Sequence, residues 1–213
     1  CPEGDRVSAG DTVNVSYTGT LNDGTVFDQG FYEFTVGGGE AIDGFDEAVV
    51  GMCVGEQKHV TIPPEKAYPY NESLVRPMLP IEFSVKKTFE VTPESFSDKF
   101  GENATVGKTY TDATLIFPVK VVSTSENITL TRPVIVGDVY SEGGWWNVTV
   151  TAVNDTEITA ERDPVEGQLI NLGILGIRTV RVNDTWIMAD FNPLVAGLTL
   201  NFDIKVLDIL GKQ

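Results

Sequence analysis

Aromatic residues with polar neighbours are the main chemical feature of this sequence. Tyr17, Phe27 and Phe45 lie close together in the chain, Asp28 directly follows Phe27, and Tyr68 comes a little later. Any one of these rings alone would favour simple core packing, because buried aromatic side chains are usually part of a core. Their joint spacing, with a carboxylate beside one ring, instead argues against simple core packing for the set.

Acid–base, nucleophilic and metal chemistry have few candidate residues. The one histidine, His59, lies in a strand-like stretch, and the two cysteines, Cys1 and Cys53, do not form a CxxC pair. Zinc or haem would therefore find almost no ligands. No catalytic triad is visible, so we expect neither a metal nor another cofactor.

Composition limits the partners. The 213 residues include 15 basic and 31 acidic ones, for a net charge of −16, and 41% are hydrophobic. Nucleic acids are polyanions, so we expect no nucleic-acid partner, and solubility is the simplest explanation of the acidity. No apolar run approaches the ~20 residues of a membrane-spanning helix, and the chain as given shows no signal peptide.

The pattern of elements predicts two domains, one inserted into the other. Alternating apolar residues predict strands at 13–17 and 198–206, and residues 42–50 place their apolar side chains on one helical face. The middle of the chain differs in composition from its two ends. We therefore predict a discontinuous domain of residues 1–79 and 187–213 and an inserted β-rich domain of residues 80–186. Strand candidates in the insert are 113–117, 147–153, 156–160, 177–182 and 185–189.

A weak internal echo links two of these insert segments. Val-Asn-Asp-Thr opens both 153–160 and 182–189, and a proline and then a glycine follow each segment. Two copies are too few for a solenoid, so the echo predicts two similar hairpins.

The residues at 15–28, VSYTGTLNDGTVFD, closely resemble the first signature of the FKBP family of prolyl isomerases. The resemblance continues in order through FTVG at 34–37, EAIDGF at 40–45, IPPEKAY at 62–68 and LNFDI at 200–204. It implies an α+β fold, in which a twisted antiparallel β-sheet wraps a short helix. The segment 68–75 resembles the flap of the SlyD-like branch, in which a chaperone domain, here mostly β, is inserted.

The resemblance also implies residue roles. The proline pocket would be lined by Tyr17, Phe27, Tyr32, Phe45 and Phe202. Asp28 would lie at its rim, the Ile42 N–H would bind a substrate carbonyl, and Tyr68 would donate its hydroxyl. Ala41, Leu74 and Leu200 would border the substrate. Phe45 stands where many members have tryptophan, Ala41 is smaller than the usual valine, and Tyr32 replaces a common phenylalanine.

The activity that the resemblance implies is rotation of the peptide bond before proline, whose barrier is about 18–20 kcal/mol. Expected partners are unfolded or proline-containing polypeptides and FK506-like macrolides. Trp145 and Trp146 could form a surface that captures unfolded chains, or they could be core. One alternative is a non-catalytic peptide-binding or chaperone module, which Phe45 and Ala41 make conceivable. Another is a structural module of the cell surface.

Sequons indicate the compartment. Seven of the eleven asparagines lie in N-x-[ST] motifs, namely Asn14, Asn71, Asn103, Asn127, Asn147, Asn154 and Asn183. Chance predicts roughly one or two such matches in this composition. We therefore expect an extracellular or cell-surface glycoprotein, of a type that would suit an archaeal exterior. Cys1 admits two interpretations, a lipid-modified first residue that attaches the protein to a membrane and an arbitrary chain boundary; a disulfide with Cys53 is also open.

Overall fold

The computed structural model describes residues 6–211, which fall into two compact units. The first unit combines residues 1–72 with 192–213, and the second comprises 73–191. No helix within the described residues is long and apolar enough to cross a membrane. Cys1 lies outside the described residues, so its lipidation and its disulfide remain predictions.

The division between the units differs slightly from the predicted boundaries. The predicted breaks, at 79/80 and 186/187, fall inside strands β4 (Val75–Pro80) and β15 (Trp186–Asp190). These two strands pair with each other, Trp186 opposite Pro80 and Asp190 opposite Val75. The pairing keeps both strands inside the second unit, which therefore begins earlier and ends later than expected.

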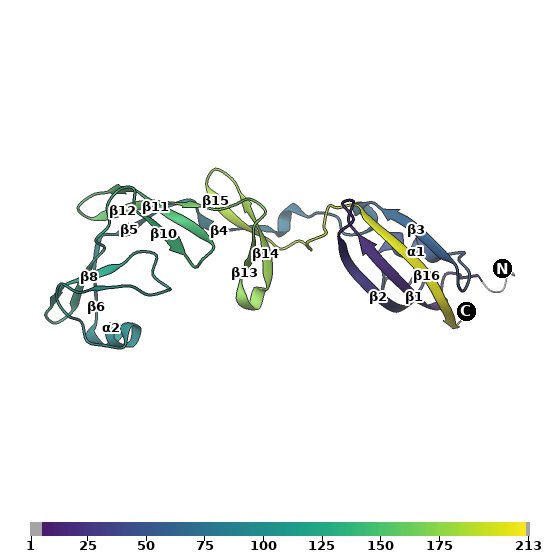
Figure 1. The fold of residues 1–213 in the computed structure, drawn as a ribbon, viewed down its shortest axis with the longest axis horizontal. Helices are drawn as coiled ribbons and strands as arrows, with labels where there is room; N and C mark the ends of the chain where they lie inside the picture. The colour runs from purple at the N-terminus through teal and green to yellow at the C-terminus, as the bar shows by residue number, and fades with distance from the viewer. Residues whose placement is uncertain (1–5, 212–213) are drawn as a thin grey trace. The chain divides into compact units, whose positions relative to one another are not determined.

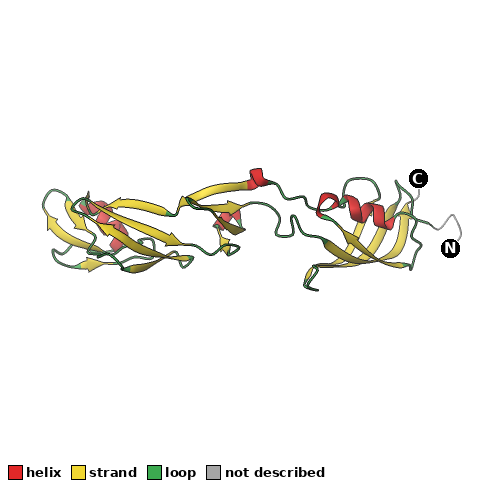
Figure 2. Cartoon of the chain, turned by 90° about the horizontal axis from the view of Figure 1, so that it is seen from above, coloured by secondary structure: helices red, strands yellow, loops and turns green. Residues whose placement is uncertain are grey.

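The first unit is a four-stranded antiparallel sheet with one helix on one face (Figure 1, Figure 2). The strand order is β2-β1-β16-β3, so the strand from the end of the chain lies between two early ones. The elements are β1 (Thr12–Thr20), β2 (Val26–Thr35), α1 (Asp43–Val49), β3 (Gln57–Ile62), the 3-10 turn η2 (Pro64–Lys66) and β16 (Leu200–Gly211). The predicted strands at 13–17 and 198–206 and the predicted helix are confirmed.

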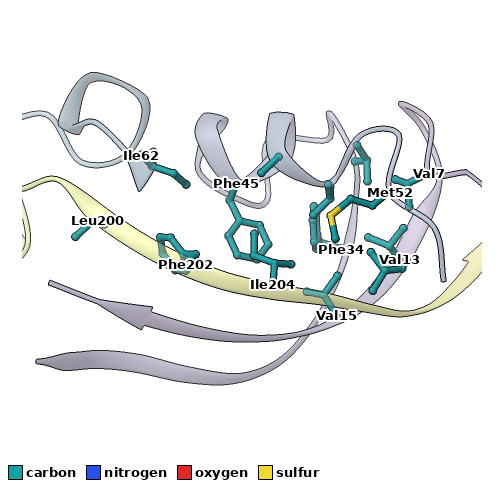
Figure 3. Packing of buried hydrophobic residues seen from close by; sticks show 14 residues of the cluster. Val7, Val13, Val15, Phe34, Phe45, Met52, Ile62, Leu200, Phe202 and Ile204 are labelled. Carbon is teal, nitrogen blue, oxygen red and sulfur yellow. The ribbon is translucent and has the colours of Figure 1, made fainter. Parts of the chain in front are cut away.

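Alternation along the strands builds the core of the first unit between sheet and helix. On β16 the side chains of Leu200, Phe202, Ile204 and Val206 are buried, and the residues between them are not. Figure 3 shows Phe45 pointing from α1 toward Phe202 and Ile204. The helix can approach closely because Gly44 has no side chain. A Cβ there would lie 2.3 Å from Cγ2 of Ile62.

Most of the second unit is two four-stranded antiparallel sheets that share one core. One sheet has the order β10-β11-β12-β5 and the other β13-β14-β15-β4. The remaining bounds are η3 (Glu72–Leu74), β5 (Glu82–Lys86), β10 (Val139–Glu142), β11 (Trp146–Val153), β12 (Glu157–Asp163), β13 (Leu169–Asn171), η4 (Gly173–Leu175) and β14 (Ile177–Val182). Buried residues from both sheets, among them Val148, Ile158, Val180 and Ile187, belong to this core.

The two hairpins predicted from the sequence echo are confirmed as β11–β12 and β14–β15. In the first, Oδ1 of Asn154 accepts hydrogen bonds from the N–H groups of Thr156 and Glu157 at 2.8 and 2.7 Å. In the second, Oδ1 of Asn183 accepts from Thr185 and Trp186 at 2.9 and 2.8 Å. The repeated Asn-Asp-Thr is thus turn chemistry, since an asparagine side chain can satisfy the backbone of a tight turn.

A third sheet in the second unit carries a core of its own. Its order is β6-β9-β8-β7, from β6 (Thr88–Val91), β9 (Ile128–Thr131), β8 (Val119–Thr124) and β7 (Thr109–Tyr110), and it packs with α2 (Pro93–Phe100). Thr92 caps α2 by accepting the N–H of Ser95, and Gly101 ends it in a left-handed conformation. Phe96 is its most buried ring.

Candidate active site

Four aromatic rings converge on the helix-covered face of the first unit's sheet. Tyr17 comes from β1, Phe27 from β2, Phe45 from α1 and Phe202 from β16. The Phe45 and Phe202 centroids lie 5.3 Å apart at 85°, and those of Phe27 and Phe202 lie 5.6 Å apart at 84°. The Tyr17 ring meets Phe45 edge to face at 5.8 Å. Such edge-to-face contacts fix the rings relative to one another.

These rings line a cleft of about 430 Å³ within the first unit. Its walls come from the residues Tyr17, Phe27, Asp28, Tyr32, Gly39, Glu40, Ala41, Ile42, Phe45, Tyr68 and Phe202. Nine of the thirteen residues predicted for the site therefore meet in one hollow. Phe45 and Phe202 are 4% and 6% exposed and form its floor, whereas Tyr68, 39% exposed, lies at its rim.

Asp28 is tied to the aromatic wall by Tyr17. The Tyr17 hydroxyl donates a hydrogen bond of 2.8 Å to Oδ2 of Asp28. Burial, and then the bond to Asp28 and its negative charge, raise the pKa of Tyr17 to about 12. Tyr17 therefore keeps its proton at neutral pH and holds the carboxylate at the cleft edge.

The segment before α1 supplies backbone groups to the cleft. Ile42 is the N-cap of α1, and its carbonyl accepts from the N–H groups of Phe45 and Asp46. An N-cap N–H has no partner within its own helix, so that of Ile42 suits a substrate carbonyl. The Tyr32 hydroxyl donates to the Glu40 carbonyl at 2.7 Å, which ties this segment to β2.

Gly19 is a functional position that the sequence predictions missed. A Cβ on Gly19 would lie 2.7 Å from Cζ of Phe27 and 3.0 Å from Cε1 of Phe202. Its missing side chain makes room for both rings in the middle of β1. A glycine inside a strand often marks such a close approach, so the signal was present. The backbone of Gly39 and Glu40 was missed for a different reason, because it contributes no side-chain pattern.

Four predicted substrate-binding residues do not line the cleft. Leu200 is fully buried in the core, so it supports the cleft from beneath and cannot touch a substrate. Leu74 belongs to the second unit, in η3. Trp146 is 5% exposed in the core of that unit, and Trp145 is half-buried against the same core. Trp146 cannot be a capture surface, because its ring is already covered.

The second unit has an apolar groove of its own, of about 390 Å³. Met78, Leu172, Leu175 and Phe191 contribute its apolar lining. The neighbouring Ile174, in η4, has a fully exposed side chain, at 104% of the reference, and Leu175 is 49% exposed. One sequence feature could have predicted this exposed surface, namely the apolar run LINLGILGI at 169–177. Its two glycines interrupt regular secondary structure, so the run cannot bury all its apolar side chains as one element.

The guanidiniums of Arg76 and Arg178 lie 5.8 and 5.0 Å from the ring centroid of Phe191. These cations stand beside the apolar groove. No group of three or more His, Cys, Asp or Glu side chains that could hold a metal occurs within residues 6–211.

Comparison with known proteins agrees with the geometry of the cleft. The profile of FKBP-type peptidyl-prolyl cis-trans isomerases matches residues 4–122, more than half of the chain. The chain belongs to this family. The matched residues include β1, β2, α1 and β3 of the first unit, which carry most of the cleft, and they extend into the second unit.

Individual relatives support the assignment. FK506-binding protein 2 of Yarrowia lipolytica is 52% identical over 68 residues, 30% of this chain and 47% of its own length. A short-type peptidyl-prolyl cis-trans isomerase of Methanocaldococcus jannaschii is 38% identical over 177 residues, 83% of this chain and 66% of its own length. The chain thus spans about half the length of the FK506-binding protein and two thirds of the archaeal one.

Proposed function

We propose that this FKBP-type protein catalyses cis–trans isomerisation of the peptide bond before proline in other polypeptides. The observation that carries the proposal is the convergence of Tyr17, Phe27, Phe45 and Phe202 on one cleft with an aromatic floor. The reaction makes and breaks no covalent bond, so it needs only a site that prefers the twisted amide.

The cleft favours the twisted amide in two ways. Rotation removes the resonance of the planar amide and lowers the charge on its oxygen, so an apolar, water-poor cleft stabilises the twisted form relative to the planar one. The Ile42 N–H and the Tyr68 hydroxyl can hold substrate carbonyls on either side of the rotating bond. Asp28, fixed by Tyr17, places a negative charge at the edge of the cleft. Each tenfold acceleration requires about 1.4 kcal/mol of such differential binding.

Substitutions of Asp28 and Tyr68 test this function. We expect Asp28→Ala to lower kcat/KM on a proline-containing peptide about tenfold or more, a loss of at least ~1.4 kcal/mol. We expect Tyr68→Phe to lower it about two- to tenfold, the usual range for one neutral hydrogen bond. The assay is proline-limited refolding together with peptide isomerisation, and Asp208→Ala, an exposed carboxylate on β16, is the matched control. A parent chain that accelerates neither reaction would favour the alternative of a non-catalytic peptide-binding module.

We propose further that the second unit captures unfolded segments for the isomerase cleft, in the manner of a SlyD-like insert. The support is the groove beside Leu172, Leu175 and Phe191 and the exposed Ile174. An exposed apolar surface of this kind is typical of protein interaction sites. The groove replaces the tryptophan pair as the candidate capture surface.

We also propose that the protein works outside the cytoplasm as a glycoprotein. Six of the seven sequon asparagines are exposed, and Asn14 is half-buried on β1. The asparagines of two sequons, Asn154 and Asn183, have a structural role in the hairpin turns. The other five sequons are not explained by these turns. Mass spectrometry of the protein from its natural cells should find sugar on peptides that contain the sequons. Unmodified asparagine at all seven sites would remove this support.

A further inference from the structure

The segment that carries Tyr68 has no regular secondary structure to hold it. It follows η2, and residues 68–71 are neither helix nor strand. Its backbone is fixed instead by the returning segment 192–197. The N–H of Gly197 donates to the Tyr68 carbonyl at 2.9 Å.

Asn192 makes two further bonds between these segments. Its Oδ1 accepts the N–H of Asn71 at 2.9 Å, and its Nδ2 donates to the Asn71 carbonyl at 3.0 Å. The side-chain amide thus offers one donor and one acceptor to a single residue, as a neighbouring β-strand would. Asn192 is 9% exposed whereas Asn71 is exposed, so the two bonds are part-buried, and each contributes about 0.5–1.5 kcal/mol net.

We infer that Asn192 is a positioning residue for Tyr68. It holds the end of the segment on which the tyrosine stands, so that the hydroxyl remains at the rim of the cleft. Gly197 holds the same segment at Tyr68 itself. The inference rests on the proposed function for its effect on activity, whereas the effect on the segment is independent of it.

A double-mutant cycle measures the effect on activity. We expect Asn192→Ala to lower kcat/KM on a proline-containing peptide about two- to tenfold in the parent, from the loss of neutral hydrogen bonds. In a Tyr68→Phe background the same change should have less than about a twofold effect, because residues that act through one another are not additive. Asn201→Ala is the matched control. That amide links Thr61 and Asn22 in the same unit and should act equally in both backgrounds.

Amide hydrogen exchange of residues 68–71 provides the second measurement. Asn192→Ala should speed exchange at Asn71, and Asn201→Ala should not. Unchanged exchange at Asn71, or equal activity losses in both backgrounds, would overturn the inference. Faster exchange in a protein whose parent shows no isomerase activity would count against the proposed function and still support the role of Asn192.

Discussion

A chain in which a short linker replaces residues 73–191 should isomerise a short proline peptide within about twofold of the parent rate. It should lose most of its acceleration on an unfolded protein, by about 100-fold if capture raises the effective substrate concentration as tethering usually does. The physical reason is that every residue lining the cleft belongs to the first unit, which has a core of its own (Figure 3). The two activities are measured by peptide isomerisation and by refolding of a proline-limited protein.

Point variants test whether the capture groove itself, and not only the presence of the inserted unit, is needed for activity on unfolded protein. Ile174→Ser with Leu175→Ser should reproduce the loss on unfolded protein and leave the peptide reaction unchanged. Val106→Ser with Val122→Ser removes comparable exposed side chains elsewhere in the same unit, at 58% and 51% exposure, and serves as the control. Equal losses on both substrates would contradict the division of labour between the units.

Gly44→Ala should destabilise the first unit by about 1–3 kcal/mol, the usual cost of overpacking a core. Helix propensity alone predicts the opposite, since alanine is better than glycine inside a helix by about 1 kcal/mol. The steric clash decides whether the substitution stabilises or destabilises the unit, because the new methyl would lie 2.3 Å from Cγ2 of Ile62, which is itself buried. Phe45 is the next residue, so the displacement should also disturb the cleft floor.

The control for this substitution is Gly30→Ala. Gly30 lies on β2, and a Cβ there meets no atom within 4 Å. Chemical denaturation should show an unchanged or slightly higher free energy of unfolding for Gly30→Ala and a lower one for Gly44→Ala. A Gly44→Ala protein as stable as the parent would mean that α1 can move away from β3 at no cost.

The architecture of the first unit could be predicted because its pattern is local and its family signature is specific. Strict alternation of apolar and polar residues predicted β1 and β16, and apolar residues on one helical face predicted α1. Most of the cleft followed from those signatures, including Tyr17, Phe27 and Asp28. What could not be predicted was backbone geometry. The Glu40 carbonyl contributes no side-chain pattern, and the bonds of Asn192 depend on contacts between distant segments. Gly19 differs from both, because a glycine inside a strand was a signal that the predictions did not use.

The second unit shows where local patterns failed. Of the five strand candidates in the insert, the segment 113–117 is not a strand. Leu115 packs in the core beside α2 and Phe117 in the core of the two larger sheets, so the segment turns between them. Trp145 and Trp146 were ambiguous for a related reason. Adjacent residues at a strand start face different surroundings, and composition alone does not say which side is covered.

The position of β16 between β1 and β3 has a consequence for biosynthesis. A chain made or exported from its N-terminus completes the second unit while β1 still lacks this partner, since Tyr17 is paired with Ile204. The edge of β1 and the apolar face of the sheet therefore stay exposed until β16 has been made. The isomerase would become active only after that point, so it could not assist the folding of its own earlier residues.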